Sequence, residues 1–243
     1  MSRDSPGRPG WVKHPRHLAL GLWRARVKIP AMRHVMSRLG EGDHAALFYR
    51  NRSEQFAAVI PYIEIGLSRN ERCLYIAGDN SVPMVIDAMQ AAGIDVVGAQ
   101  RRGQLTVATP EQTYLKNGVF EPEKMVEGLQ EEIQLSLAQG FSAFRGTGEL
   151  GWAVGLPTAL VRLYEYERLL DSSVASRFVA LCQYNESLFH GDIVARMLRI
   201  HPMVVTRNRL IQNPYYVPPG TCWTEHPRVD VDYLMSTATT VYA

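Results

Sequence analysis

Short apolar runs alternate with longer amphipathic segments along most of this chain, and this alternation constrains the fold more than any other feature. Each apolar run has four to six residues, and segments of about 10 to 18 residues with helical periodicity separate the runs. Parallel strands need crossover connections of a dozen or more residues, whereas hairpins do not. The sequence therefore predicts an α/β domain with a mostly parallel central sheet and helices on both faces.

Six strands and five main helices follow from this pattern. The strands are expected at 44–49, 73–77, 105–108, 141–144, 178–182 and 203–206. The helices are expected at 54–68, 81–93, 122–139, 156–170 and 192–199. In sheets of this kind, functional side chains collect beyond the carboxyl ends of the strands, so the strand ends are where site residues are sought.

The composition is that of a protein with a hydrophobic core. Hydrophobic residues make up 46% and charged residues 21% of the 243 residues, which suits one large domain. No apolar run approaches the roughly 18 residues needed to span a bilayer, and no small-residue cleavage site follows the apolar stretch 18–23. We therefore expect a cytoplasmic protein without a membrane span. Cys73, Cys182 and Cys222 are too widely spaced for a disulfide framework or a zinc-binding CxxC pair.

The charge is distributed unevenly. Residues 1–38 carry nine basic residues and one acidic residue, whereas the rest of the chain carries 17 basic and 23 acidic residues. We predict a basic, partly disordered arm at 1–39, a domain at 40–219 and a polar tail at 220–243. The arm could bind an anionic partner such as nucleic acid, or it could be a solvated extension without a partner.

The first strand does not lead into a phosphate-binding loop. Such a loop needs glycines, whose backbone N–H groups surround the phosphates, and a lysine that reaches the outer phosphates. No glycine or lysine occurs between His44 and Ser53. The stretch 146–151 also lacks the glycine spacing of a dinucleotide-binding turn. We therefore expect no P-loop nucleotide site and no bound cofactor.

The end of the fourth strand contains the most informative polar residues. Arg145, Glu149 and Trp152 lie within eight residues, and the glycines between them permit a sharp turn. A guanidinium, a carboxylate and an aromatic wall are groups that a small organic ligand requires. Alternatively, Arg145 and Glu149 form an ion pair that fixes the loop, and Trp152 belongs to the core.

The fifth strand ends in Cys182, Gln183 and Tyr184. Because strand side chains alternate, Cys182 and Tyr184 are expected on one face. Cys182 could contact a ligand, could be reactive if a nearby cation lowered its pKa, or could be an inert core thiol. The predicted ligand-binding residues are therefore Arg145, Glu149, Trp152, Cys182, Gln183 and Tyr184.

The sequence shows no catalytic constellation, with neither GxSxG nor HExxH. His44 begins the first strand, so it is expected at the opposite end of the sheet from the loops that follow the strands, with a structural role. We predict no catalytic residue and no metal site. An enzyme that uses Cys182 or Glu149 stays open as an alternative.

Several short motifs follow one another in an order that resembles one family. The motifs are Gly42-Asp43-His44 with Tyr49, Gly66-Leu67, residues 71–75, Arg145 through Trp152, Tyr164-Glu165, Leu181 through Tyr184, His201-Pro202 and residues 213–219. Together they cover about residues 40–219. In the order and spacing of these motifs, the chain resembles the MEDS domain. This is the sensory domain named after methanogens, methylotrophs and the dichloromethane-responsive repressor.

This resemblance implies a diverged, three-layer RecA/KaiC-like fold without a working P-loop. It also implies prokaryotic signalling through the sensing of simple hydrocarbon derivatives, with an effect on transcription. Such domains often sit beside a DNA-binding, kinase or anti-sigma-type module. No helix-turn-helix fits after the domain, so we expect a small organic ligand and a separate protein partner of one of those types. Nucleic-acid binding through the basic arm and a homodimer stay open.

Overall fold

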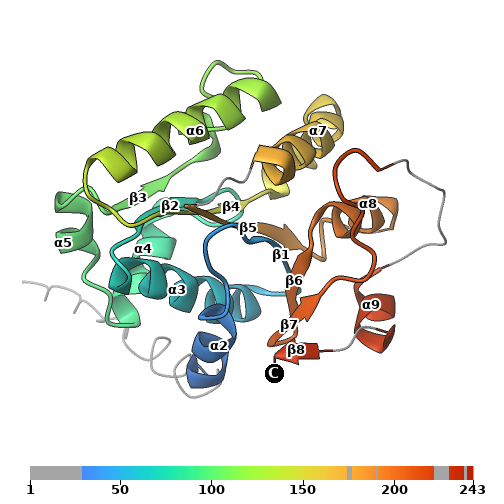
Figure 1. Cartoon of the computed structure of the whole chain (residues 1–243), viewed down its shortest axis with the longest axis horizontal. Helices are drawn as coiled ribbons and strands as arrows, with labels where there is room; N and C mark the ends of the chain where they lie inside the picture. Colours follow the sequence, from blue (N-terminus) through green and yellow to red (C-terminus); the bar gives the residue numbers. More distant parts are fainter. Residues whose placement is uncertain (1–28, 174–176, 190, 222–229, 238–239, 243) are drawn as a thin grey trace, which may run out of the picture.

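The computed structural model describes residues 29–173, 177–189, 191–221, 230–237 and 240–242. In this part of the chain, eight strands form one sheet with the order β3-β2-β4-β5-β1-β6-β7-β8 (Figure 1). The six strands β1 to β6 are parallel to one another, and β7 and β8 extend the sheet in antiparallel pairing. The strands are β1 (His44–Tyr49), β2 (Arg72–Ile76), β3 (Leu105–Ala108), β4 (Phe144–Glu149), β5 (Phe178–Asn185), β6 (Met203–Thr206), β7 (Arg209–Gln212) and β8 (Thr240–Tyr242).

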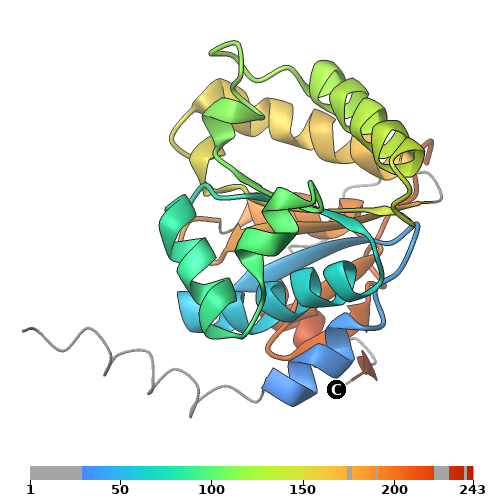
Figure 2. The same cartoon turned by 90° about the vertical axis from the view of Figure 1, so that its left-hand side faces the viewer.

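Helices cover both faces of this sheet, and Figure 2 shows the resulting three layers, with α6 in green and α7 in yellow above the sheet. One face carries α6 (Pro122–Ala138), α7 (Pro157–Ser173), α8 (Asp192–Ile200) and α9 (Val231–Thr237). The other face carries α2 (Ile29–Met36), α3 (Arg52–Ser68), α4 (Val82–Ala91) and α5 (Val96–Arg101). Among the described residues, no helix has the length and apolar character needed to cross a membrane.

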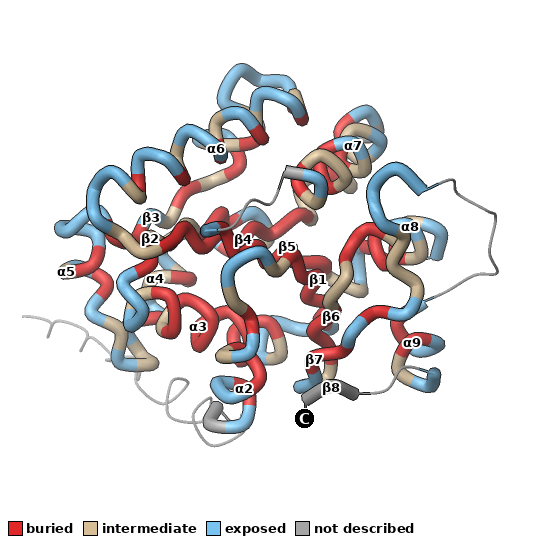
Figure 3. The backbone as a smooth tube through the Cα atoms, viewed as in Figure 1, coloured by how far each residue is buried: buried red, intermediate tan, exposed pale blue. Residues whose placement is uncertain are grey.

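The central strand β1 shows why the sheet needs continuous apolar runs. All six of its residues are buried. Ala46 and Phe48 pack in the core beneath α7 and α8, whereas Ala45 and Leu47 pack in the core beneath α3. A strand with helices on both faces has no solvent side, so alternation of apolar and polar residues is lost. Figure 3 shows the consequence, a buried sheet between helices that are buried on their inner sides.

The predicted fold class, a three-layer α/β domain with a mostly parallel sheet, is confirmed. The position of the fourth strand is wrong, because β4 runs over Phe144–Glu149 rather than 141–144. Gly146 and Gly148 therefore lie inside a strand and not in a turn. A Cβ atom on Gly148 would lie 2.3 Å from the Tyr114 hydroxyl, and one on Gly146 would lie 3.1 Å from the Phe178 ring. These glycines allow other side chains to pack closely against the strand. A glycine that permits close packing looks the same in the sequence as a glycine that permits a turn.

Both ends of the described chain pack on the domain. The helix α2, which falls in the expected arm, buries Met32 and Met36 in the core next to α3. At the other end, Leu234 of α9 is buried and β8 pairs with β7. Residues 29–39 and part of 230–242 therefore contribute to the core and to the sheet. The rest of the expected arm, residues 1–28, and Cys222 lie outside the described residues.

The packing over β4 makes Gly148 intolerant of a side chain. We expect Gly148→Ala to lower the free energy of unfolding by about 1–3 kcal/mol, because the new methyl group overlaps the Tyr114 hydroxyl. Adding Tyr114→Phe removes the overlapping atom and should recover most of this loss. Denaturant unfolding of the single and double variants measures both effects.

Gly128 provides the matched control for this substitution. It lies inside α6, and a Cβ atom there would meet no atom within 4 Å. Gly128→Ala should therefore raise stability by about 0.5–1 kcal/mol through helix propensity. Equal effects at Gly128 and Gly148 would contradict this description of the packing.

Candidate functional site

A cleft opens between α6 and the β2–β3 edge of the sheet. Its volume is about 650 Å³, within the roughly 300–1,000 Å³ that is typical of ligand pockets. Its apolar lining includes Leu74, Val107 and Phe144 from the strands and Met125 and Leu129 from α6. Its charged lining includes the exposed side chains of Lys116, Lys124 and Glu131. An apolar wall with a charged border suits a small organic molecule.

A smaller void of about 20 Å³ lies next to this cleft, deeper in the domain. Four residues line both spaces, namely Leu74, Tyr114, Met125 and Leu129. The void also borders Gly146, Gly148, Tyr166, Leu170 and Cys182. Its size corresponds to roughly one or two water molecules. The shared side chains therefore lie between the cleft and a small space that borders Cys182.

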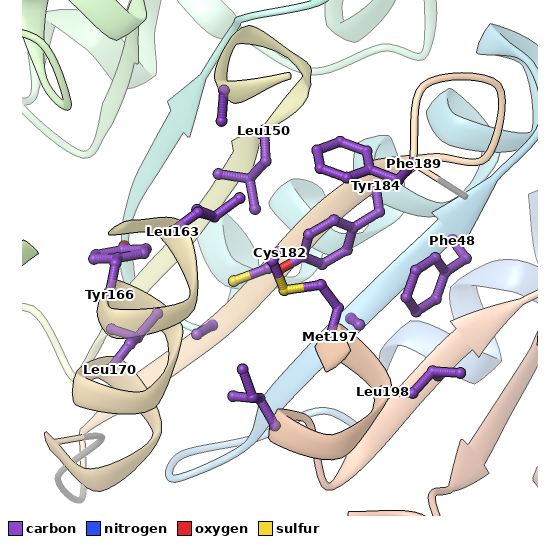
Figure 4. Packing of buried hydrophobic residues seen from close by; sticks show 14 of the residues in the cluster. Phe48, Leu150, Leu163, Tyr166, Leu170, Cys182, Tyr184, Phe189, Met197 and Leu198 are labelled. Atoms are coloured by element: carbon purple, nitrogen blue, oxygen red, sulfur yellow. The ribbon is translucent and has the colours of Figure 1, made fainter. Parts of the chain in front are cut away.

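Cys182 lies in the interior of β5, beneath α7 and α8. Figure 4 shows its side chain among those of Leu163, Tyr166, Met197 and Tyr184. The strand continues to Asn185, three residues beyond its predicted end, so Cys182 does not mark the end of the strand. The thiol therefore lies part-way along the strand, where side chains from other elements can contact it.

Three further polar side chains meet Cys182 at this depth. His44 comes from the start of β1, Glu167 from α7 and His201 from the residue after α8, and all four side chains are buried. Glu167 Oε2 lies 3.2 Å from His44 Nε2, 3.4 Å from His201 Nε2 and 3.2 Å from Cys182 Sγ. Tyr184 donates a hydrogen bond of 2.7 Å to Glu167 Oε1. We call His44, Glu167, Cys182 and His201 the central cluster.

Outer contacts orient the two histidines. His44 Nδ1 lies 3.2 Å from Asp171 Oδ1, and His201 Nδ1 lies 2.8 Å from the backbone oxygen of Met197. A carbonyl oxygen only accepts, so His201 carries a proton on Nδ1. The Nε2 atoms of both rings therefore face Glu167.

The charges in the central cluster follow from burial and from these contacts. Burial alone would raise the pKa of Glu167, but the two histidines outweigh it and lower the pKa, so Glu167 is a carboxylate. Burial alone would lower the pKa of His44, but hydrogen bonds to Asp171 and Glu167 raise it overall. Burial and the nearby His44 lower the pKa of His201.

The thiol of Cys182 is protonated in this environment. Burial raises its pKa well above the usual value, and the neighbouring Glu167 carboxylate raises it further. The thiolate is the nucleophilic form of cysteine, so a protonated and buried thiol is a poor nucleophile. The geometry does not favour the alternative of an enzyme that uses Cys182.

Glu149 ends β4 on the opposite face of the sheet, where six hydrogen bonds hold it. Its Oε2 accepts from the backbone N–H groups of residues 78–80 at 2.5–2.8 Å. Its Oε1 accepts from the side chains of Tyr75, Gln55 and Asn80 at 2.6–3.0 Å. Gln55 also donates to Gln183 at 2.8 Å. Both carboxylate oxygens are thus used to fix the loop after β2.

Arg145 lies on the same strand as Glu149 but does not pair with it. Its guanidinium donates two hydrogen bonds to Glu71, one of them 3.2 Å long, and lies 4.5 Å from the centre of the Tyr62 ring. Four residues of extended strand separate Arg145 from Glu149 by about 13 Å. The alternative of an Arg145–Glu149 ion pair is therefore wrong, and the pair that forms is a buried one with Glu71.

Trp152 lies behind the wall of the cleft. Its ring stacks on Tyr114 with centroids 5.1 Å apart and meets Phe120 edge-on at 5.1 Å. Tyr114 lines both the cleft and the void, whereas Trp152 lines neither of them. Within the described residues, the indole nitrogen of Trp152 is buried without a hydrogen-bond partner.

The six predicted ligand residues therefore occupy four places. Cys182 and Tyr184 lie together in or beside the central cluster, as strand alternation predicted. Glu149 and Gln183 share a polar network on the other face. Arg145 and Trp152 are each separate from both groups.

The partners of Cys182 could not be identified from the sequence. As predicted, His44 begins β1, at the opposite end of the sheet from the loops that follow the strands, but its Nε2 lies 3.5 Å from Cys182 Sγ because Cys182 lies inside β5. Glu167 and His201 are 15 and 19 residues from Cys182, with no spacing that marks a shared site. The one signal for the two histidines was their place in the motifs Gly42-Asp43-His44 and His201-Pro202.

Residues 43–202 match the family model described as the methanogen/methylotroph, DcmR sensory domain, MEDS. The chain belongs to this family. The matched region contains the whole central cluster and the three strands that line the void, β2, β4 and β5. Membership of a family of sensory domains gives this MEDS protein a signalling role.

The proteins similar to this MEDS protein include a curated relative and a solved structure. The relative is the transcriptional repressor DcmR of Methylorubrum extorquens, which is 24% identical over 161 residues. That alignment covers 65% of this chain and 58% of the repressor, so the chain spans less than two thirds of the repressor's length. The structure is that of a KaiC-like protein from the archaeon Pyrococcus horikoshii, with a TM-score of 0.49 and 11% identity over 68% of this chain and 71% of that chain.

The hydrogen bonds to Glu149 make its charge essential for stability. Glu149→Gln places an amide N–H₂ group against donors in either orientation of the side chain, so we expect a loss of about 3–5 kcal/mol in the free energy of unfolding. Glu165→Gln changes an exposed carboxylate on α7 and should stay within about 0.5 kcal/mol of the original chain. Urea unfolding of both variants measures the difference. A change at Glu149 as small as that at Glu165 would contradict its structural role.

Proposed function

We propose that this MEDS protein is a sensory domain that binds a small organic molecule, of the hydrocarbon-derivative class, and passes the signal to a separate transcription regulator. The observation that carries this proposal is the cleft of about 650 Å³ together with the void of about 20 Å³ next to it. The apolar shared lining suits an apolar ligand. The void admits only one or two heavy atoms, which favours one- and two-carbon compounds at its inner end.

Tyr114 is the residue through which a bound ligand would act on the surface. It lines both spaces and belongs to the segment between β3 and α6. Its ring contacts Trp152, Phe120 and Tyr166, which lie on three different segments. A ligand that fits only one position of Tyr114 would favour one arrangement of the segment that precedes α6. That segment carries the exposed side chains of Lys116 and Val119, which a partner could contact.

Ligand binding is tested by following the thermal stability of the full chain during titration with one- and two-carbon halides, alcohols and thiols. We expect one of these classes to stabilise the chain saturably, by about 2.7 kcal/mol when the ligand concentration reaches about 100 times its Kd. Gly128→Leu should abolish this stabilisation, because the added side chain enters the cleft from an open position on α6. Gln130→Leu places the same side chain on the exposed side of α6 and should leave the stabilisation unchanged.

Equal ligand-induced stabilisation of the original chain and Gly128→Leu would place the ligand outside the cleft. No stabilisation by any compound of these classes would reject this ligand class. Both results would leave the family assignment intact, since that rests on the sequence match.

The proposed output through a separate regulator makes a distinct prediction about DNA. The full chain, with its ligand present or absent, should show no ligand-dependent DNA binding. Ligand-dependent and salt-sensitive DNA binding that disappears when residues 1–28 are deleted would instead assign the output to the basic arm. Mobility-shift measurements at low and high salt distinguish the two outcomes.

A further inference from the structure

We propose that the central cluster is a zinc-binding site, with His44 Nε2, His201 Nε2, Cys182 Sγ and Glu167 Oε2 as the four ligands. Imidazole nitrogen, thiolate sulfur and carboxylate oxygen are donor types that zinc accepts, and the four donors come from four separate segments of the chain. The site is independent of the small-molecule ligand proposed above and would exist without it.

The arrangement of the histidines is the first argument. Histidine ligands of metals almost always donate their other ring N–H to a carboxylate or a backbone carbonyl. Here His44 Nδ1 faces the Asp171 carboxylate, and His201 Nδ1 faces the Met197 carbonyl oxygen. In both rings, the nitrogen that would bind the metal is Nε2, and both Nε2 atoms face Glu167 Oε2.

An unpaired buried nitrogen is the second and independent argument. His201 is fully buried, and among the described residues its Nε2 has no hydrogen-bond partner, although Glu167 Oε2 lies 3.4 Å away. With the ring proton on Nδ1, Nε2 presents a lone pair to a carboxylate oxygen, which also carries lone pairs. Two acceptors that face each other in a buried site need a cation or a proton between them.

The distances between the donor atoms match those of a tetrahedral zinc site. With Zn–N of about 2.0–2.1 Å and Zn–S of about 2.3 Å, neighbouring ligand atoms in a tetrahedron lie about 3.3–3.6 Å apart. Four of the six separations in the central cluster are 3.2, 3.2, 3.4 and 3.5 Å. All six are within 4.8 Å, so small side-chain adjustments complete the tetrahedron.

The chemistry of the donors favours zinc over the hard cations. Magnesium and calcium prefer oxygen ligands, whereas imidazole and thiolate together suit zinc. Binding breaks the Cys182 S–H bond and the Nε2–H bond of a protonated His44, releases these protons to solvent, and forms Zn–S and Zn–N bonds. The thiolate and the Glu167 carboxylate then balance the two positive charges of the ion. A neutral centre avoids the large cost of a net charge in a buried site.

The test starts with metal analysis of the full chain, purified without metal-affinity resin or chelators. Mass spectrometry of the elements should find about one zinc ion per chain, and zinc should be lost from Cys182→Ser and from His201→Ala. Cys73→Ser is the matched control, because Cys73 is the other buried cysteine of the described residues and lies outside the central cluster. It should keep its zinc.

Cobalt substitution identifies the ligands directly. After zinc is removed and cobalt(II) is added, the original chain and Cys73→Ser should show the intense d–d bands of tetrahedral cobalt and a thiolate-to-cobalt charge-transfer band. Cys182→Ser should lose the charge-transfer band. Asp171→Asn, which alters the contact of His44 Nδ1 and one oxygen that accepts from the Tyr216 hydroxyl but removes no zinc ligand, should keep the bands and weaken affinity by about 10- to 100-fold.

Circular dichroism of each variant separates loss of the metal from loss of the fold. If His201→Ala does not fold, the original chain still tests the proposal. Zinc added to this chain after removal of metal by a chelator should raise its Tm, and the rise in Tm should saturate at one equivalent of zinc. The proposal is overturned if the folded original chain takes up neither zinc nor cobalt. It is also overturned if a Cys182→Ser/His201→Ala double variant binds as much zinc as the original chain, because the metal then lies elsewhere in the chain.

Discussion

The rest of the domain is organised around a carboxylate that cannot be left alone in its interior. Glu167 is fully buried, and groups from β1, β5 and the end of α8 contact its two oxygens. An isolated charge at this depth would be prohibitively unfavourable, so these elements are held in positions where they compensate it. The packing of α7 and α8 over the centre of the sheet therefore depends on electrostatics as well as on apolar burial.

Strand alternation then separates two kinds of chemistry on the two faces of the sheet. On the α3 face, Glu149 and Gln183 belong to a closed hydrogen-bond network that fixes the loop after β2. On the α7 face, Gly146 and Gly148 leave room beside Tyr114 and Cys182. Both oxygens of Glu149 are used by this network, whereas the other face contains both the unpaired nitrogen of His201 and the space for a ligand. Binding is therefore expected on the α7 face.

Much of the fold could be predicted from the sequence, because each strand is a short apolar run that local pattern identifies. Glycine was the main source of error, since Gly146 and Gly148 act through close packing with Tyr114 and Phe178, which lie 30 or more residues away. Strands β7 and β8 were missed as well. They are short, and β8 falls in a segment of serine and threonine whose pairing partner is distant in sequence.

The site was harder to predict, for a related reason. Alternation correctly placed Cys182 and Tyr184 on one face, but it says nothing about which helix covers them. The meeting of Cys182 with His44 depends on the register of β1 with β5, and its meeting with Glu167 depends on how α7 crosses the sheet. Neither is encoded in a local motif.

X-ray absorption at the zinc edge of the purified full chain tests this view of the centre most directly. A zinc ion in the central cluster has one sulfur neighbour at about 2.3 Å and three nitrogen or oxygen neighbours at about 2.0–2.1 Å. We expect this first coordination shell in the purified chain. A shell of nitrogen and oxygen alone, with six neighbours at longer distances, would show that Cys182 is not a ligand and would contradict it.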